Sequence, residues 1–480
     1  MERPLTGKRP TFRPARGGNN FYRVMLLISL ILVGIWMVMG VERGQIISPL
    51  ASTPTPTRMA ASYFLEAQAY FEAGKLDDPS NEAPDSPPVN DAIEAYQAAL
   101  QSEPGNAQTW AELARIQTYS SSMLRNDQER LVRLEEAVAS SAKAVELAPD
   151  DSTVRAIRAF VLDWYAFSPL VTAERRVELL IEAEREASRA FQLDPENARA
   201  LAYYAEILAD QQKWTQAEKY AAQAAALDPE SMDTHRVYGY VLETLGKYNS
   251  AIQQYQEAAR INPNLTFLYI RIGQNYREGI CSQSLAESCY ERALDYFDRA
   301  AKINEQLGIL HPLPFIEIAR TYTQIGQFFA ASINAEKALE YDPTNAHTYG
   351  QLGIIFRRAR NYEGAMSLLK CAVRGCTAAE NEMGKSDVQG LPLTSFSVAY
   401  YYVEYGTNLA FLSRPNENYC EEAMQVLEET RLAYGSDPTL LSIIEDSQGI
   451  CRRLQGGQVA VPTITPMPAE TEIPGAMPGG

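Results

Sequence analysis

The chain has 480 residues, of which 46% are hydrophobic, and its 60 acidic against 43 basic side chains give a net charge of −17. This length suffices for several domains or for one long repeat array. The acidic surplus argues against nucleic acid and anionic lipid surfaces as partners, because both repel a negatively charged protein.

The N-terminal segment is basic and leads into an apolar run. Residues 24–41 comprise 18 residues without a charge, and a helix of that length nearly crosses a hydrocarbon core of ~30 Å. We therefore predict a transmembrane helix, with a cleaved secretory signal as the alternative. Residues 1–23 are predicted to be cytoplasmic, which makes the rest extracytoplasmic and the protein a single-pass component of the cell membrane. The basic side chains behind this orientation are Arg3, Lys8, Arg9, Arg13, Arg16 and Arg23.

Two segments rich in proline and threonine flank the central part of the chain. Residues 42–59 read as a linker, and residues 456–480 read as a disordered tail. Both contain too few apolar residues to form a packed core. Without the six basic and one acidic side chains of residues 1–41, the remainder carries a net charge of −22.

Between these segments the sequence repeats itself. Pro195, Pro229 and Pro263 follow one another at an equal spacing of about 34 residues, and two clean copies of a helical pattern fill residues 198–264. Small residues recur at fixed positions of each copy, at helical spacing. They are Ala205, Ala217 and Ala224 in one copy, and Gly239, Ala251 and Ala258 in the next, where Tyr255 adds a bulky position.

This pattern resembles the tetratricopeptide repeat (TPR), a helix-turn-helix unit of about 34 residues. The resemblance implies an all-α solenoid, a right-handed superhelix of about nine units over residues 60–436. A capping helix over residues 437–455 would cover its open apolar end. Extra residues are expected near 77–90, 119–130, 279–290 and 375–394. In the third unit Arg155 and Arg158 stand where apolar residues belong.

Six cysteines, all after residue 280, form no Cys-x-x-Cys motif. Cys281 and Cys289 bracket the insertion of the sixth unit, and Cys420 and Cys451 lie at similar distances on either side of a turn near Ser436. Bridges in these two pairs leave Cys371 with Cys376, around Gly375. Six buried free thiols are the alternative.

The sequence contains few signs of a catalytic or metal-binding site. The three histidines, His235, His311 and His347, are far apart, and the chain contains no phosphate-binding loop, nucleophile elbow or zinc-binding motif. We therefore expect no enzyme activity, no cofactor and no metal site. Function then depends on the surfaces of the array.

In TPR arrays the first helix of each unit lines a concave groove, and the resemblance places eleven residues there. We expect them to face solvent and to suit an extended acidic or carboxylate-ended peptide, because arginine offers two parallel donors. Pairing of the arginines with nearby glutamates is the alternative. The groove candidates are Arg236, Tyr240, Phe267, Ile270, Gln274, Arg277, Ile316, Arg320, His347, Ile354 and Arg357.

The predicted function is a membrane-anchored, extracytoplasmic TPR scaffold that holds a protein or peptide partner at the cell envelope. The alternative is a structural or accessory subunit of an envelope assembly or envelope enzyme that grips no discrete peptide. The partner and the oligomeric state are not specified by these patterns.

Overall fold

The computed structural model describes residues 21–42, 58–77, 90–124, 127–284 and 287–455. The chain divides into two compact units, Met1–Arg58 and Met59–Gly480, which are described separately. Most of the predicted linker, most of the first insertion, the predicted tail and nearly all of the basic N-terminal segment lie outside the described residues.

The first unit contributes one helix, α1 (Phe21–Glu42). Across the described residues, none of the helices combines the length and the apolarity that a membrane crossing requires. The transmembrane helix predicted over residues 24–41 is therefore corrected, and with it the localisation and orientation derived from that helix. The physical reason is that the apolar run of 18 residues rises by about 27 Å, which is less than the ~30 Å thickness of the hydrocarbon core.

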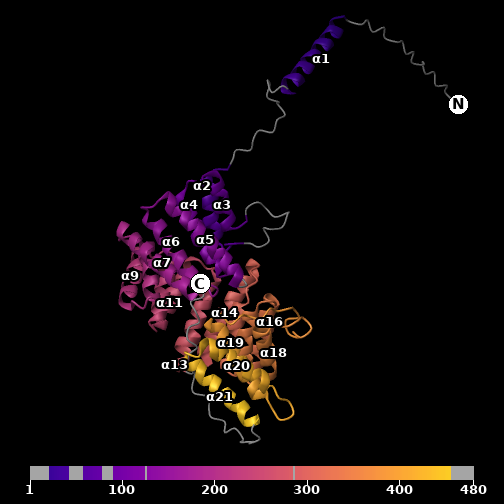
Figure 1. The fold of residues 1–480 in the computed structure, drawn as a ribbon. Helices are drawn as coiled ribbons and strands as arrows, with labels where there is room; N and C mark the ends of the chain where they lie inside the picture. Colours follow the sequence, from indigo (N-terminus) through magenta and orange to yellow (C-terminus); the bar gives the residue numbers. More distant parts are fainter. Residues whose placement is uncertain (1–20, 43–57, 78–89, 125–126, 285–286, 456–480) are drawn as a thin grey trace, which may run out of the picture. The chain divides into compact units, whose positions relative to one another are not determined.

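The second unit is a stack of helix-turn-helix pairs, and it contains no β-strand among its described residues (Figure 1). Among the residues of this unit that the structure describes, nine pairs follow one another in chain order, and the two helices of each pair pack together. The pairs are α2 (Ala60–Glu72) with α3 (Ala92–Ser102), α4 (Ala107–Ser121) with α5 (Asp127–Leu147), α6 (Ser152–Ala166) with α7 (Ala173–Leu193), α8 (Ala198–Asp210) with α9 (Trp214–Leu227), α10 (Met232–Thr244) with α11 (Tyr248–Ile261), α12 (Thr266–Gln274) with α14 (Glu287–Leu307), α15 (Leu313–Gln324) with α16 (Phe328–Tyr341), α17 (Ala346–Arg358) with α18 (Tyr362–Val373), and α19 (Phe396–Leu412) with α20 (Cys420–Tyr434).

A last helix, α21 (Pro438–Gln455), packs against α19 and α20. Its Leu440, Ile444 and Cys451 are fully buried. An open repeat array exposes an apolar face at its end, and the packing of α21 on α19 and α20 removes these three residues from water.

The local sequence explains where the helices begin and end. Asn106, Asp151 and Asn197 precede first helices, and their side chains accept N–H bonds from the first turn. Pro229 and Pro263 stand two residues after α9 and α11, where a proline cannot continue a helix.

The small residues lie where two helices cross. A Cβ added to Gly239 on α10 would come within 2.9 Å of the Tyr255 ring on α11, so a side chain there has no room. Ala205, Ala217 and Ala224 are all fully buried. The repeat pattern is thus a packing pattern, which allows the helices to approach closely.

The additional residues of the irregular units lengthen helices and enlarge loops. Helices α5 and α7 have 21 residues each, compared with 14 in α9. Seven residues are about two helical turns, so the buried face of each helix is preserved. In the sixth unit the chain passes through a π-helix, η2 (Asn275–Ile280), and a short helix, α13 (Cys281–Ser284), before α14.

Candidate functional site

The groove candidate Arg236 lies on α10 and is buried. Its Nη1 and Nη2 donate to the two oxygens of Glu206 at 2.7 and 2.6 Å, and its Nε donates to the Tyr119 hydroxyl at 3.1 Å. This is a complete bidentate pair between α8 and α10. The expectation that Arg236 faces solvent is therefore wrong, because a carboxylate of the same chain already satisfies it.

Arg277 is also buried, and it shares a carboxylate with Arg320. The Arg277 side chain is fully buried and forms ion pairs with Glu317 and Glu278. Arg320 Nη1 lies 3.1 Å from Glu317, and this side chain is 23% exposed. The solvent-facing expectation fails for Arg277, whereas Arg320 remains partly accessible.

Arg357 on α17 forms an ion pair with Glu404 on α19 and is 18% exposed. Gln274 Nε2 donates to Glu317 at 3.3 Å, and the Tyr240 hydroxyl donates to Asp210. The structure therefore places these polar candidates against carboxylates of the chain, as the alternative interpretation proposed.

The apolar candidates and the histidine lie in the same interior. Phe267 on α12 stacks on Tyr119 of α4 at 5.6 Å between ring centroids. Ile270 and Ile316 are buried, and Ile354 is partly buried. His347 Nε2 lies 3.4 Å from Asp127 of α5, and burial lowers its pKa.

A charged network that the sequence did not reveal joins first helices far apart in the chain. Arg115 on α4 pairs with Glu112 at 2.8 Å and with Asp233 on α10 at 3.2 Å, although 118 residues separate Arg115 from Asp233. Arg199 on α8 adds a 2.6 Å bond to Glu112. Burial acts to raise the pKa values of Glu112 and Asp233, but Arg115 and Arg199 hold both below their usual range.

One part of this interior carries more acid than base. Asp163 on α6 and Asp210 on α8 are hydrogen-bonded to each other, close to Glu206 and Arg236. Burial and Asp210 raise the pKa of Asp163 well above its ordinary value, and burial raises that of Asp210 to about 7. A carboxyl pair of this kind holds a proton at pH values where exposed aspartates are ionised.

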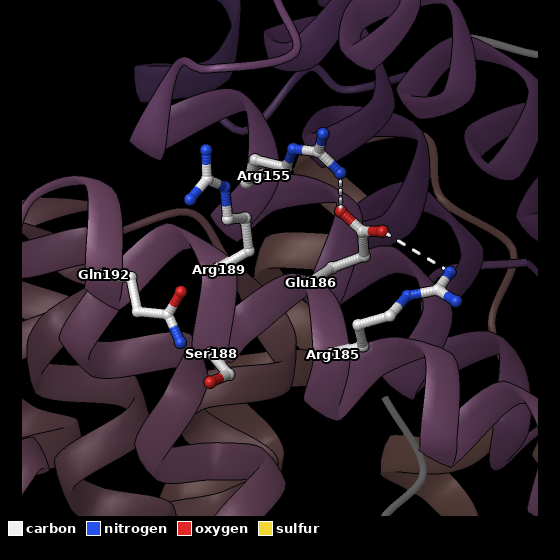
Figure 2. A pocket seen from close by; sticks show the side chains of 6 residues that line it. All are labelled: Arg155, Arg185, Glu186, Ser188, Arg189 and Gln192. Carbon is white, nitrogen blue, oxygen red and sulfur yellow. Dashed lines mark hydrogen bonds and ion pairs between the residues drawn. The ribbon is translucent and has the colours of Figure 1, made fainter.

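A cavity of about 390 Å³ opens at α6 and α7 (Figure 2). Glu186 lies between two arginines there: Arg155 Nη1 donates to it at 2.5 Å, and Arg185 Nη2 lies 3.7 Å away on its other side. Arg189 Nη2 donates to Asp150 at 2.8 Å. The lining residues are Arg155, Arg185, Glu186, Ser188, Arg189 and Gln192.

One sign of this basic cavity is visible in the repeat pattern. Arg155 departs from the apolar residue expected at its position in the repeat, and the structure shows it reaching out to Glu186 and to the Pro149 carbonyl, 2.7 Å away. Arg185 and Arg189 lie on α7, which is the second helix of its unit, whereas the repeat pattern predicts groove residues on first helices alone.

The six cysteines form three bridges, in the pairs that their spacing suggested. Cys281 joins Cys289, Cys371 joins Cys376 and Cys420 joins Cys451, with Cα–Cα distances of 5.5, 4.8 and 5.4 Å. The second bridge closes a turn at Gly375, whose φ of 80° favours glycine.

Comparison with known proteins locates the repeat in the sequence. A family profile for the tetratricopeptide repeat matches residues 205–265, and a search of curated proteins returned no match.

Several solved structures are similar in fold. TTC0263, a thermophilic TPR protein of Thermus thermophilus, is 17% identical over 45% of this chain and 98% of its own, with a TM-score of 0.34. PilF of Pseudomonas aeruginosa is 18% identical over 53% of this chain and 98% of its own, with a TM-score of 0.33. The human IFIT1 dimer with m7Gppp-AAAA is 16% identical over 75% of this chain and 70% of its own, with a TM-score of 0.49. The profile match, together with the stacked helix pairs, identifies an all-α array of the tetratricopeptide-repeat type.

Proposed function

We propose that this protein is a non-catalytic scaffold that binds other proteins. The observation that carries the proposal is the array itself, in which nine helix pairs of the described residues follow one another and bury their small residues in a common core. Stacked repeats of this kind supply binding surface in proportion to their number.

The more specific form of the proposal is that an extended acidic or carboxylate-ended peptide binds in the concave groove. Two candidates support it, because Arg320 and Arg357 keep 23% and 18% of their side chains exposed. A peptide carboxylate would have to exchange with Glu317 or Glu404 at these positions. Arg236 and Arg277 are buried in ion pairs, so we assign them to holding the groove together rather than to contacting the peptide.

Affinity capture with the purified full chain, followed by binding measurements on the captured proteins as purified components, tests the scaffold. We expect at least one direct partner, bound with a Kd in the micromolar range or tighter. Sedimentation of the chain alone separates partner binding from self-association. A chain that binds no purified candidate directly would contradict the scaffold function.

A double variant, Arg320→Ala with Arg357→Ala, tests the groove. Each arginine that contacts a peptide carboxylate should contribute on the order of tenfold in affinity. The matched control is Arg260→Ala, since Arg260 is an exposed arginine on a second helix that also pairs with glutamates. Equal affinities for the double variant and the control would rule out the groove and leave the scaffold in place.

A further inference from the structure

The outward face of α7 combines apolar and basic residues at one spacing. Val177, Ile181, Arg185 and Arg189 follow one another every four residues, so they lie in a row along one side of the helix. Val177 is 58% and Ile181 65% exposed, and the side chains of Arg185 and Arg189 are 72% and 45% exposed. We call these four residues the α7 stripe.

The fold of α7 does not require this stripe. The helix packs against α6 and α8 through its opposite side, where Leu179, Ala183, Ala187 and Ala190 are buried. The outward side of α7 therefore leaves two large aliphatic side chains, Val177 and Ile181, in water. Burying each of them against another surface would be favourable, because exposed aliphatic groups gain free energy when they leave water.

The basic end of the stripe opens into the cavity at α6 and α7, where the charge is unbalanced. Three arginines line that cavity against one glutamate, Glu186, and Arg189 reaches the exposed Asp150 as well. Arg155 Nη1 lies 2.5 Å from one oxygen of Glu186, whereas Arg185 Nη2 lies 3.7 Å from the other oxygen and forms only a weak ion pair (Figure 2).

Three of the other four glutamates of α7 are already paired with cations, and the fourth, Glu174, lies in the first turn, at the opposite end of the helix from Arg185 and Arg189. Arg175 binds Glu178 at 2.8 Å, Arg158 binds Glu182 at 2.9 Å, and Lys213 binds Glu184 at 2.6 Å. These glutamates therefore do not cancel the positive charge at the basic end of the stripe. The basic end of the stripe therefore carries a net positive charge within a chain of net charge −17, and an acidic group can bind there.

We propose that the α7 stripe docks an acidic amphipathic helix of a partner protein. The apolar side of the partner helix would cover Val177 and Ile181, and its carboxylates would bind Arg185 and Arg189. The stripe runs over about 12 residues, or ~18 Å, which corresponds to some three turns of a partner helix. This inference rests on the proposed scaffold function and assigns it a surface and a class of partner.

Two other occupants fit less well. A second copy of the chain paired through a two-fold axis would set the stripe against itself, and the stripe contains no carboxylate that could bind Arg185 and Arg189. A nucleic acid would leave Val177 and Ile181 in water, and its phosphates would be repelled by the acidic remainder of the chain.

The test uses a labelled synthetic peptide of about five helical turns, with leucines along one face of its helix and glutamates at one end. Its Kd for the full chain is measured by fluorescence anisotropy. We expect Arg185→Ala with Arg189→Ala, and separately Ile181→Asp, to weaken binding by about tenfold or more. A peptide with glutamine in place of each glutamate should bind the unaltered chain about tenfold more weakly.

The matched control is Phe329→Asp, which changes an aromatic residue that is 83% exposed on α16. We expect it to leave the Kd unchanged, and all variants should keep the thermal midpoint of the unaltered chain because the altered residues are exposed. Equal Kd values for the stripe variants and Phe329→Asp, equal binding of the two peptides, or no binding of the acidic peptide would overturn the inference. If purified partners still bind the full chain in that case, the scaffold function stands and its surface lies elsewhere.

Discussion

At the scale of single residues, the interior of this array is held by buried ion pairs that occupy the predicted binding positions. Repeat position predicted that Arg236 and Arg277 face solvent in a groove, and the structure instead buries both in ion pairs. Their burial could not be predicted, since it depends on how tightly the array winds and on which first helices then meet. A buried pair of this kind strongly destabilises the fold when one partner is removed, because the other charge is left alone.

The carboxyl pair Asp163–Asp210 makes stability depend on pH. Burial raises the pKa of Asp210 to about 7, while an aspartate in the unfolded chain titrates near 3.9. Between these values the pair holds more protons in the folded chain than in the unfolded chain, so its contribution to the free energy of unfolding falls as pH rises from about 4 to 7. We predict that Asp210→Asn reduces this decrease in the free energy of unfolding by on the order of a few kcal/mol.

Urea denaturation at several pH values between 4.5 and 8 measures the effect. Glu230→Gln is the control, because Glu230 is 74% exposed and should leave the profile unchanged. A profile for Asp210→Asn that runs parallel to that of the unaltered chain would show that the pair does not titrate in this range.

At the scale of helices and loops, the repeat period was enough to predict the helix pairs, because small residues and prolines must recur wherever two helices cross and end. It could not show that the extra residues of the second and third units would lengthen α5 and α7, since an insertion of that size fits a loop equally well. The α7 stripe begins in the lengthened part of the helix, at Val177. The stripe also lies on a second helix, and the repeat pattern predicts groove residues only on first helices.

The bridge between Cys420 and Cys451 should stabilise the packing of α21 at the end of the array. It joins α20 to α21 across a sequence separation of 31, and a closed loop of that size contributes roughly 3–4 kcal/mol in the chain-entropy model. We predict that Cys420→Ala with Cys451→Ala accelerates hydrogen exchange in α21 before any other helix. In the control pair, Cys281→Ala with Cys289→Ala, the separation is 8, and faster exchange should centre on η2 and α14. Unchanged protection of α21 would contradict this role.

At the scale of the whole array, contacts between distant repeats set this protein apart from a simple stack. Tyr119 on α4 donates to Asp233, accepts from Arg236 at 3.1 Å, and stacks on Phe267 of α12. Asn264 Nδ2 likewise donates to the Ala73 carbonyl at 3.0 Å, across 191 residues. In a nearest-neighbour array each repeat contacts only the repeats directly before and after it. These contacts give the first units and the middle units a common interior.

Tyr119→Ala tests that coupling. Tyr119 is fully buried against rings from α2, α6 and α12, so truncation should cost about 3–5 kcal/mol. Because its partners belong to distant repeats, we predict faster hydrogen exchange in α10 and α12 as well as in the adjacent α6. Tyr204→Ala is the matched control, since Tyr204 contacts Phe191 and Tyr220 on the neighbouring α7 and α9, and its effect should stay within those helices. If the change caused by Tyr119→Ala ends at α6, the array behaves as a nearest-neighbour stack, and the contacts across its interior add nothing to its cooperativity.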